Sequence, residues 1–140
     1  MTDSPLDRYA SAFETLTPDS LPALTALFAP DGRFVDPFHD ARGRDAIADV
    51  FARMFASVAE PRFAVSHRVV AGSVGYLKWR FTGVVRGRAL DIVGLSEVTF
   101  DADGLATSHV DYWDAAANVY ERVPVLGAVL RWLRGRIAGG

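Results

Sequence analysis

The sequence predicts an α+β fold in which three helices precede a run of antiparallel strands. Before Pro61, apolar residues recur at three- and four-residue spacing, which is typical of amphipathic helices. After Pro61, β-branched and aromatic residues alternate with polar ones between glycine-containing turns. A strongly curved antiparallel or mixed sheet around the long third helix would leave a concave face. Any part of that face that the helix does not fill becomes a pocket.

The composition suits one compact domain, residues 1–140, because half of the 140 residues are hydrophobic. The formal net charge of −2 gives no broad basic field, so we do not expect nucleic acid as a partner. The absence of cysteine excludes disulfides and thiolate catalysis. We find neither a secretory leader nor a run of about 18 apolar residues, and we therefore expect a cytoplasmic protein.

The first two helices have recognisable limits. Apolar residues from Leu6 to Leu16 form the stripe of the first helix, which Thr17-Pro18 ends. The second helix is short, with Asp19 or Ser20 as its N-cap. The turn-forming Pro30-Asp31-Gly32 segment ends it.

A short strand and the longest helix follow. Arg33 to Val35 are predicted to form a strand that leads to Asp36-Pro37. Asp45, near the start of the third helix, suits the positive end of the helix dipole. The apolar face of this helix is formed by Ile47, Val50, Phe51, Met54, Phe55 and Val58.

The rest of the chain predicts four strands and a helical extension. The strands lie in residues 62–72, 74–85, 88–104 and 105–114, and their short connections favour an antiparallel meander. Residues 115–140 form the extension, whose last helix carries arginines opposite an apolar stripe. A membrane-surface helix would look similar, but its cationic residues are few for stable binding. We expect this helix to cover the pocket mouth or the sheet, or to contact a second subunit.

Two motifs connect this order of elements with a known family. The segment LTALFAPDGRFVDPF with the following GRDAI, and the segment LDIV with FDADGLATSHVDYW, resemble the nuclear transport factor 2-like (NTF2-like) superfamily. The resemblance is greatest to its SnoaL-like and ketosteroid isomerase-like members, and it covers Leu6 to Asp114. It implies a cone-shaped fold and a homodimer built through the sheet. It leaves function open, because members range from isomerases, cyclases and hydratases to binding modules without chemistry.

The resemblance implies roles for three residues. Asp36 matches the general base of ketosteroid isomerase-like enzymes, which moves a proton between carbons. Tyr9 matches the tyrosine of the oxyanion hole, and Trp113 matches the tryptophan that lines the pocket. The other interpretation of Asp36 is a solvent-exposed aspartate that caps the turn at Pro37.

The last strand adds a polar pair to this site. Because side chains alternate along a strand, His109 and Asp111 would point to the same side as Trp113 and could form a hydrogen-bonded acid–base pair. The alternative is a pair that faces outward. The second, protonated acid of the family falls on Ser96 or Gly94 here, so the resemblance implies an incomplete oxyanion hole.

The other two histidines have weaker claims to a functional role. His39 lies in a loop, close enough to Asp36 to reach the pocket rim. His67 is expected on the first strand of the meander as a hydrogen-bonded structural residue. Because no HxH or HExxH spacing occurs, we predict neither a metal nor another cofactor.

The predicted site therefore combines acid–base groups with apolar walls. The ligand-binding residues are expected to be Trp113, Trp79, Phe13, Phe38, Phe55, Leu77, Ser96 and Val98. We expect a cofactor-free isomerase, cyclase or hydratase acting on a small apolar carbonyl-bearing molecule, such as a polyketide, terpenoid or steroid-like compound. Asp36 would be the base, Tyr9 a donor to the enolate oxygen, and His109 with Asp111 a second acid–base pair. The alternative is a non-catalytic module that binds a small apolar ligand or a partner protein.

Overall fold

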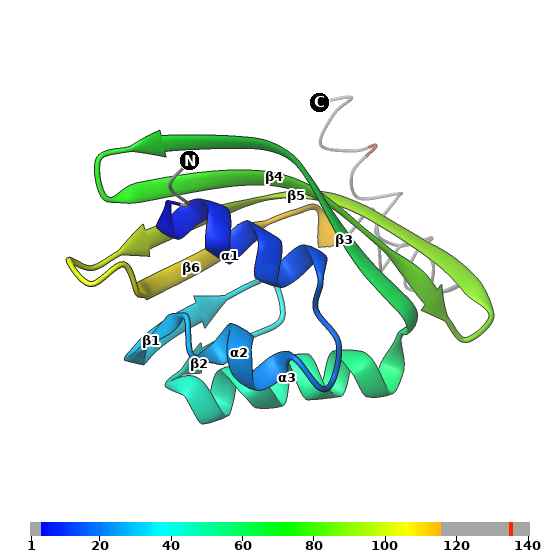
Figure 1. The fold of residues 1–140 in the computed structure, drawn as a ribbon. Coiled ribbons are helices and arrows are strands. Elements are labelled where there is room, and N and C mark those ends of the chain that lie inside the picture. Colours follow the sequence, from blue (N-terminus) through cyan, green and yellow to red (C-terminus); the bar gives the residue numbers. More distant parts are fainter. Residues whose placement is uncertain (1–3, 116–134, 136–140) are drawn as a thin grey trace.

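The computed structural model describes residues 4–115 and Gly135. Most of the predicted C-terminal extension therefore lies outside the described residues. The elements are α1 (Pro5–Glu14), α2 (Leu21–Thr25), β1 (Phe28–Val35), β2 (Asp40–Arg42), α3 (Arg44–Ser57), β3 (Ala59–Ala71), β4 (Val74–Val85), β5 (Arg88–Phe100) and β6 (Ala106–Tyr112) (Figure 1). In the part of the chain described, no helix is long and apolar enough to cross a membrane.

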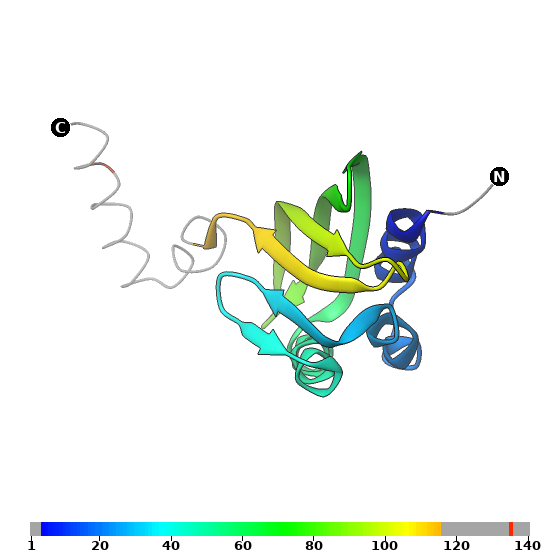
Figure 2. The same cartoon turned by 90° about the vertical axis from the view of Figure 1, so that its left-hand side faces the viewer.

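The six strands form one curved, unclosed sheet in the order β2-β1-β6-β5-β4-β3. The β1–β6 pair is parallel and every other neighbouring pair is antiparallel, so the sheet is mixed. Figures 1 and 2 show that the sheet bends over the helices, with α1 and α3 on its concave side. The predicted α+β class and the four-stranded meander from β3 to β6 are both confirmed.

The two main helices fill the concave face unequally. Ser4 and Asp7 form a capping box that fixes the start of α1, and Tyr9 and Phe13 of this helix are buried in the core. On α3, Ile47 and Phe51 are buried. The rest of its predicted apolar face, Val50, Met54, Phe55 and Val58, is only partly covered. An incompletely covered helix face leaves room for a cavity.

The segment before Asp36 differs from the prediction. Residues 30–32 do not end a helix but lie within β1, which starts at Phe28. The register of β1 against β6 shifts between Phe28 and Arg33, and a Cβ on Gly32 would lie 2.9 Å from the carbonyl oxygen of Ala106. The turn-like sequence thus forms an irregularity inside a strand, where a strand neighbour approaches too closely for a larger residue.

The loop after Asp36 contains a short strand that the sequence did not predict. Residues 40–42 form β2 and pair antiparallel with β1. The guanidinium of Arg33 donates to both carboxylate oxygens of Asp40, at 2.8 and 2.6 Å. Asp36 consequently lies in a tight turn between two paired strands.

His67 lies on β3, the first strand of the meander, as predicted, but it does not pack on the inner face of the sheet. An extra residue in β3 shifts the register between Val65 and His67, which interrupts the alternation of inward and outward side chains. His67 is exposed, and its Nδ1 lies 3.0 Å from the hydroxyl of Ser66. It takes no part in the core.

Candidate functional site

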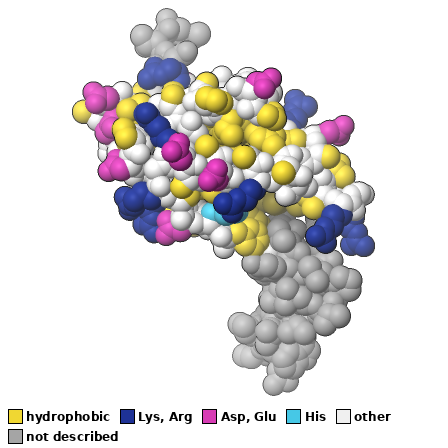
Figure 3. Space-filling view, turned by 90° about the horizontal axis from the view of Figure 1, so that it is seen from below, with side chains coloured by type: hydrophobic (Ala, Val, Ile, Leu, Met, Phe, Trp, Pro, Cys, Tyr) yellow, Lys and Arg dark blue, Asp and Glu magenta, His cyan; other side chains and the backbone are white. Residues whose placement is uncertain are grey.

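A cavity of about 410 Å³ lies where the concave face of the sheet meets α3. This volume is within the usual range of ligand pockets. Its titratable lining residues are Asp36, His39, Arg53 and Asp111. Eight aromatic residues form most of the remaining wall: Phe13, Phe34, Phe38, Phe51, Phe63, Trp79, Phe81 and Trp113. Viewed from the side of α2 and α3, the surface shows hydrophobic side chains gathered between charged ones, with a histidine beside them (Figure 3).

Asp36 holds the turn between β1 and β2. Its Oδ1 accepts hydrogen bonds from the backbone N–H groups of Phe38 at 2.8 Å and His39 at 2.7 Å. The side chain is only 13% exposed and also lines the cavity. Asp36 is therefore both the cap of the turn and a residue of the pocket lining.

Asp36 also orients His39. The Nδ1 atom of His39 lies 2.9 Å and 3.0 Å from the two carboxylate oxygens of Asp36. Since an ionised carboxylate only accepts, Nδ1 carries the proton. In the neutral ring the lone pair is then on Nε2, which has no hydrogen-bond partner within residues 4–115. The spacing of an aspartate and a histidine across a tight turn was the signal that could have identified this pair.

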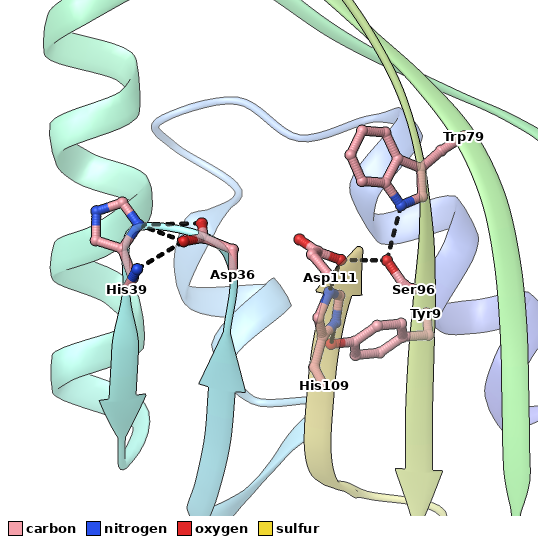
Figure 4. A network of polar contacts seen from close by, with 7 residues as sticks. All are labelled: Tyr9, Asp36, His39, Trp79, Ser96, His109 and Asp111. Atoms are coloured by element: carbon pink, nitrogen blue, oxygen red, sulfur yellow. Dashed lines mark hydrogen bonds and ion pairs between the residues drawn. The ribbon is translucent and has the colours of Figure 1, made fainter. Parts of the chain in front are cut away.

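A second network lies deeper, and its members come from four different elements. The hydroxyl of Tyr9 lies 2.6 Å from Nδ1 of His109, whose Nε2 lies 2.6 Å from Oδ1 of Asp111. From the other direction, Nε1 of Trp79 donates to the hydroxyl of Ser96 at 2.8 Å, and this hydroxyl donates to the same Asp111 oxygen. Figure 4 shows this chain of contacts, with the Asp36–His39 pair separate from it.

The direction of these hydrogen bonds follows from the burial of Tyr9. Tyr9 has no exposed surface, and the only acceptor bonded to its hydroxyl within the described chain is His109. Burial, together with the charge of Asp111, raises the pKa of Tyr9 well above its usual range, so the phenol stays protonated. It must then donate to Nδ1 of His109, which leaves the proton of this neutral ring on Nε2, where it bonds to Asp111.

Both hydrogen bonds that Asp111 accepts, from Ser96 and from Nε2 of His109, therefore fall on the same oxygen, Oδ1. The other oxygen, Oδ2, has no hydrogen-bond partner among the residues described, and Asp111 lines the cavity. The side chain of Asp111 is 14% exposed, whereas that of His109 is 3% exposed. The network thus presents a carboxylate oxygen, an acceptor, to the cavity.

The structure also distinguishes the two candidate positions for a second acid. Ser96 is buried and its hydroxyl donates to Asp111. A Cβ on Gly94 would overlap the ring of Trp79, which lies directly over this glycine. Gly94 is therefore a packing position beneath Trp79, and Ser96 occupies the site next to Asp111.

The predicted ligand-binding residues divide into three groups. Phe13, Phe38, Trp79 and Trp113 line the large cavity. Leu77 and Ser96 line a second cavity of about 20 Å³ beside Asp111 and His109. Neither cavity is lined by Tyr9, Phe55 or Val98, since Tyr9 and Val98 are fully buried and Phe55 packs against the core.

The described residues contain no group of three or more histidine, aspartate or glutamate side chains that could hold a metal ion. The hydrogen bonds of Asp36 and Asp111 instead go to their neighbouring histidines and to local donors.

The fold and the open cavity define the class of protein. A curved mixed sheet around a long helix is the NTF2-like fold, and solved structures share it. The sequence model of the SnoaL-like domain matches residues 7–109, so the chain belongs to the SnoaL-like domain family. The family resemblance seen in the sequence is thereby confirmed.

Three solved structures illustrate the likeness. A hypothetical protein with a ketosteroid isomerase-like fold from Catenulispora acidiphila DSM 44928, in complex with trimethylamine, has a TM-score of 0.72 and 22% identity over 85% of this chain and 92% of that one. A protein assigned as a SnoaL-like polyketide cyclase from Shewanella putrefaciens CN-32 has a TM-score of 0.66 and 20% identity over 79% and 87%. TerC, co-crystallised with polyporic acid, has a TM-score of 0.70 and 17% identity over 81% and 91%.

At these identities the likeness shows the fold alone. Among curated proteins, none matches the sequence significantly.

Proposed function

We propose that this protein is a cofactor-free acid/base enzyme of the isomerase, cyclase or hydratase type, acting on a small apolar carbonyl-bearing molecule in the large cavity. The observation that carries the proposal is the Asp36–His39 pair at the edge of an apolar cavity. A histidine held by a carboxylate through Nδ1 can accept a proton on Nε2, and the carboxylate then stabilises the imidazolium. Histidines titrate close to neutral pH, which suits a general base.

The reaction would begin with proton abstraction next to the carbonyl group. The proton moves from carbon to Nε2 of His39, and the electron pair of the broken C–H bond moves into an enolate. Return of the proton to another carbon gives an isomer. Alternatively, the enolate carbon attacks a second carbonyl of the same molecule, which forms the C–C bond of a ring, and His39 returns its proton to the resulting alkoxide. In this scheme Asp36 orients His39 instead of taking the proton itself.

The enolate oxygen needs a partner other than Tyr9. The hydroxyl of Tyr9 donates to His109 and does not reach the cavity lining. Arg53 on α3 lines the cavity and carries a positive charge, so it would stabilise the negative oxygen. Ser57, four residues later on the same helix face, lines the cavity beside it.

The structural neighbours support a small-molecule site. One of them is described in complex with trimethylamine and another was co-crystallised with polyporic acid. A third is assigned as a polyketide cyclase.

The second candidate function is a module that binds a small apolar ligand without chemistry. The observation in its favour is that the donors of Tyr9, Ser96 and Trp79 are all used within the protein. The buried network therefore supplies no hydrogen-bond donor to an enolate.

Deuterium exchange separates the two functions without knowledge of the natural substrate. The protein is incubated in D₂O with a panel of apolar ketones and diketones, and loss of the α-proton signal is followed by NMR. We expect catalysed exchange that falls at least about a hundredfold in His39→Gln, because a general base contributes about 10²–10⁴. The matched control is His67→Gln, an exposed histidine outside the cavity, which should exchange like wild type.

Two results would contradict the proposal. Binding of ketones without any exchange would leave only the binding module. Unchanged exchange in His39→Gln would remove His39 from the role of base.

A further inference from the structure

The ionisable group within ion-pair distance of Asp111 in the described chain is His109, at 2.6 Å. Because Tyr9 donates to Nδ1, His109 is neutral, and Ser96 and Trp79 carry no charge. No lysine or arginine of the described chain forms a salt bridge with Asp111. The network therefore carries one net negative charge.

A buried carboxylate without a counter-ion is unfavourable, so its position needs an explanation. Oδ1 accepts hydrogen bonds from two neutral donors only, the hydroxyl of Ser96 and Nε2 of His109. Oδ2 accepts hydrogen bonds and cannot donate while the carboxyl is ionised. A ligand that fills the cavity next to Asp111 must supply a donor or a positive charge.

The walls around this carboxylate favour a positive charge. Trp79 is linked to Asp111 through Ser96, and Phe34 and Phe13 lie against the ring of His109 with centroids 4.7 and 5.6 Å away. Eight aromatic residues line the cavity as a whole. The faces of aromatic rings attract cations, and cages of aromatic side chains bind quaternary ammonium groups.

The other charged groups of the cavity do not cancel this preference. Both carboxylate oxygens of Asp36 already accept hydrogen bonds from the ring of His39. Arg53 is exposed on α3, on the side where the proposed function places the carbonyl group. Asp111 is more enclosed than Arg53, the other charged residue of the lining that is not bonded to His39.

We propose that the ligand of this cavity carries an alkylammonium group, which binds against Oδ2 of Asp111 and the aromatic walls. This inference rests on the proposed function in one respect, because it places the ligand in the same cavity. The ammonium group lies at Asp111, and the carbonyl group of the same molecule lies toward His39 and Arg53. The substrate class is therefore a small apolar amino ketone.

Binding of benzyltrimethylammonium tests the proposal without any turnover. Calorimetric titration should show saturable binding to wild type that weakens at least about tenfold in Asp111→Asn. The matched control is Asp103→Asn, which removes an exposed carboxylate outside the lining of the cavity. It should change the affinity by less than about threefold.

A comparison in the wild-type protein needs no variant. Neopentylbenzene has the same shape as benzyltrimethylammonium, with carbon in place of the charged nitrogen. Quenching of tryptophan fluorescence, to which Trp79 and Trp113 contribute, should show at least about tenfold weaker binding of the neutral molecule.

Three outcomes would overturn the inference: no binding of the cation, equal binding of its neutral isostere, or equal losses in Asp111→Asn and Asp103→Asn. None of them affects the deuterium-exchange result. The failure of this inference and the failure of the proposed enzyme function are therefore distinguishable.

Discussion

Two aspartate–histidine pairs border the same cavity, and they differ in which residue of the pair leaves an atom without a hydrogen-bond partner in the described chain. In the Asp36–His39 pair the carboxylate holds Nδ1, so the imidazole Nε2 is the group without a partner in the described chain. In the His109–Asp111 pair the carboxylate holds Nε2 and Tyr9 occupies Nδ1, so a carboxylate oxygen is left instead. The same two residue types thus present an imidazole nitrogen at one place and a carboxylate oxygen at the other.

The difference arises from the local backbone. Asp36 and His39 lie in a tight turn, where two backbone N–H groups already hold the aspartate. His109 and Asp111 lie two residues apart on β6, on the face that α1 covers with Tyr9. The turn leaves His39 partly exposed, whereas His109 on the strand is buried.

The largest expected effect comes from neutralising each carboxylate in turn. Asp36→Asn should lower the turnover rate in the exchange assay at least about a hundredfold, because His39 loses the group that orients it and stabilises its charged form. Asp111→Asn should act mainly on KM for substrates with an amino group, with a smaller change in kcat. Steady-state kinetics separate the two parameters. Equal effects of both variants on kcat would show that the pairs do not differ in role.

The packing of Trp79 over Gly94 gives the next prediction. Gly94→Ala would place a Cβ within the ring of Trp79, so the indole must move away from Ser96. We expect a loss of about 1–3 kcal/mol in the free energy of unfolding. Urea denaturation measures the loss, and a shift in tryptophan emission reports the displaced ring. A variant as stable as wild type with unchanged emission would argue against this packing.

Tyr9→Phe removes the donor that keeps His109 neutral. The free energy of unfolding should fall by about 1–3 kcal/mol, because Nδ1 of His109 is left buried without a partner. Denaturation at pH 7 gives this value. Retention of full stability would mean that the hydrogen bond contributes little.

The same variant changes the alkaline limit of stability. The pKa of Tyr9 is raised in the folded state by burial and by the charge of Asp111. The stability that Tyr9 gives the folded state through this shift is therefore complete below pH 10.0, the ordinary pKa of tyrosine. It is lost as the pH rises above that pKa, because only the unfolded chain then loses the proton. Tyr9→Phe should weaken this decline in stability above pH 10. Tyr76→Phe is a useful control, since Tyr76 also has a raised pKa, through its hydrogen bond to Glu97, but lies outside the network.

The smallest expected effect concerns the outer face of the sheet. Val93, Leu95 and Tyr112 are exposed on the neighbouring strands β5 and β6, with Leu95 directly opposite Tyr112. If the homodimer implied by the family resemblance forms through this face, Leu95→Arg should yield a monomer with the cavity intact. Light scattering measures the mass, and a wild-type monomer would contradict the dimer.

The alternation of side chains was enough to place His109, Asp111 and Trp113 on one face of a strand. It failed in β3, because one extra residue changes the face of everything beyond it and the sequence does not mark such a position. In β1 the error was different, because Pro30-Asp31-Gly32 has the composition of a turn but forms an irregularity within the strand. The link between Tyr9 and His109 joins residues that are 100 positions apart, so no local pattern predicts it. The choice between Ser96 and Gly94 depended on the register of β5 against β4 and β6, which only the structure provides.

The protonation of the two histidines is the most direct test of the account. Long-range ¹H–¹⁵N NMR correlation distinguishes the two neutral forms of each ring, with exposed His67 as an internal reference. At neutral to mildly alkaline pH, the account predicts a proton on Nδ1 of His39 and on Nε2 of His109. The same tautomer at both residues, or a doubly protonated His109, would contradict the assignment of a base to one pair and an unneutralised carboxylate to the other.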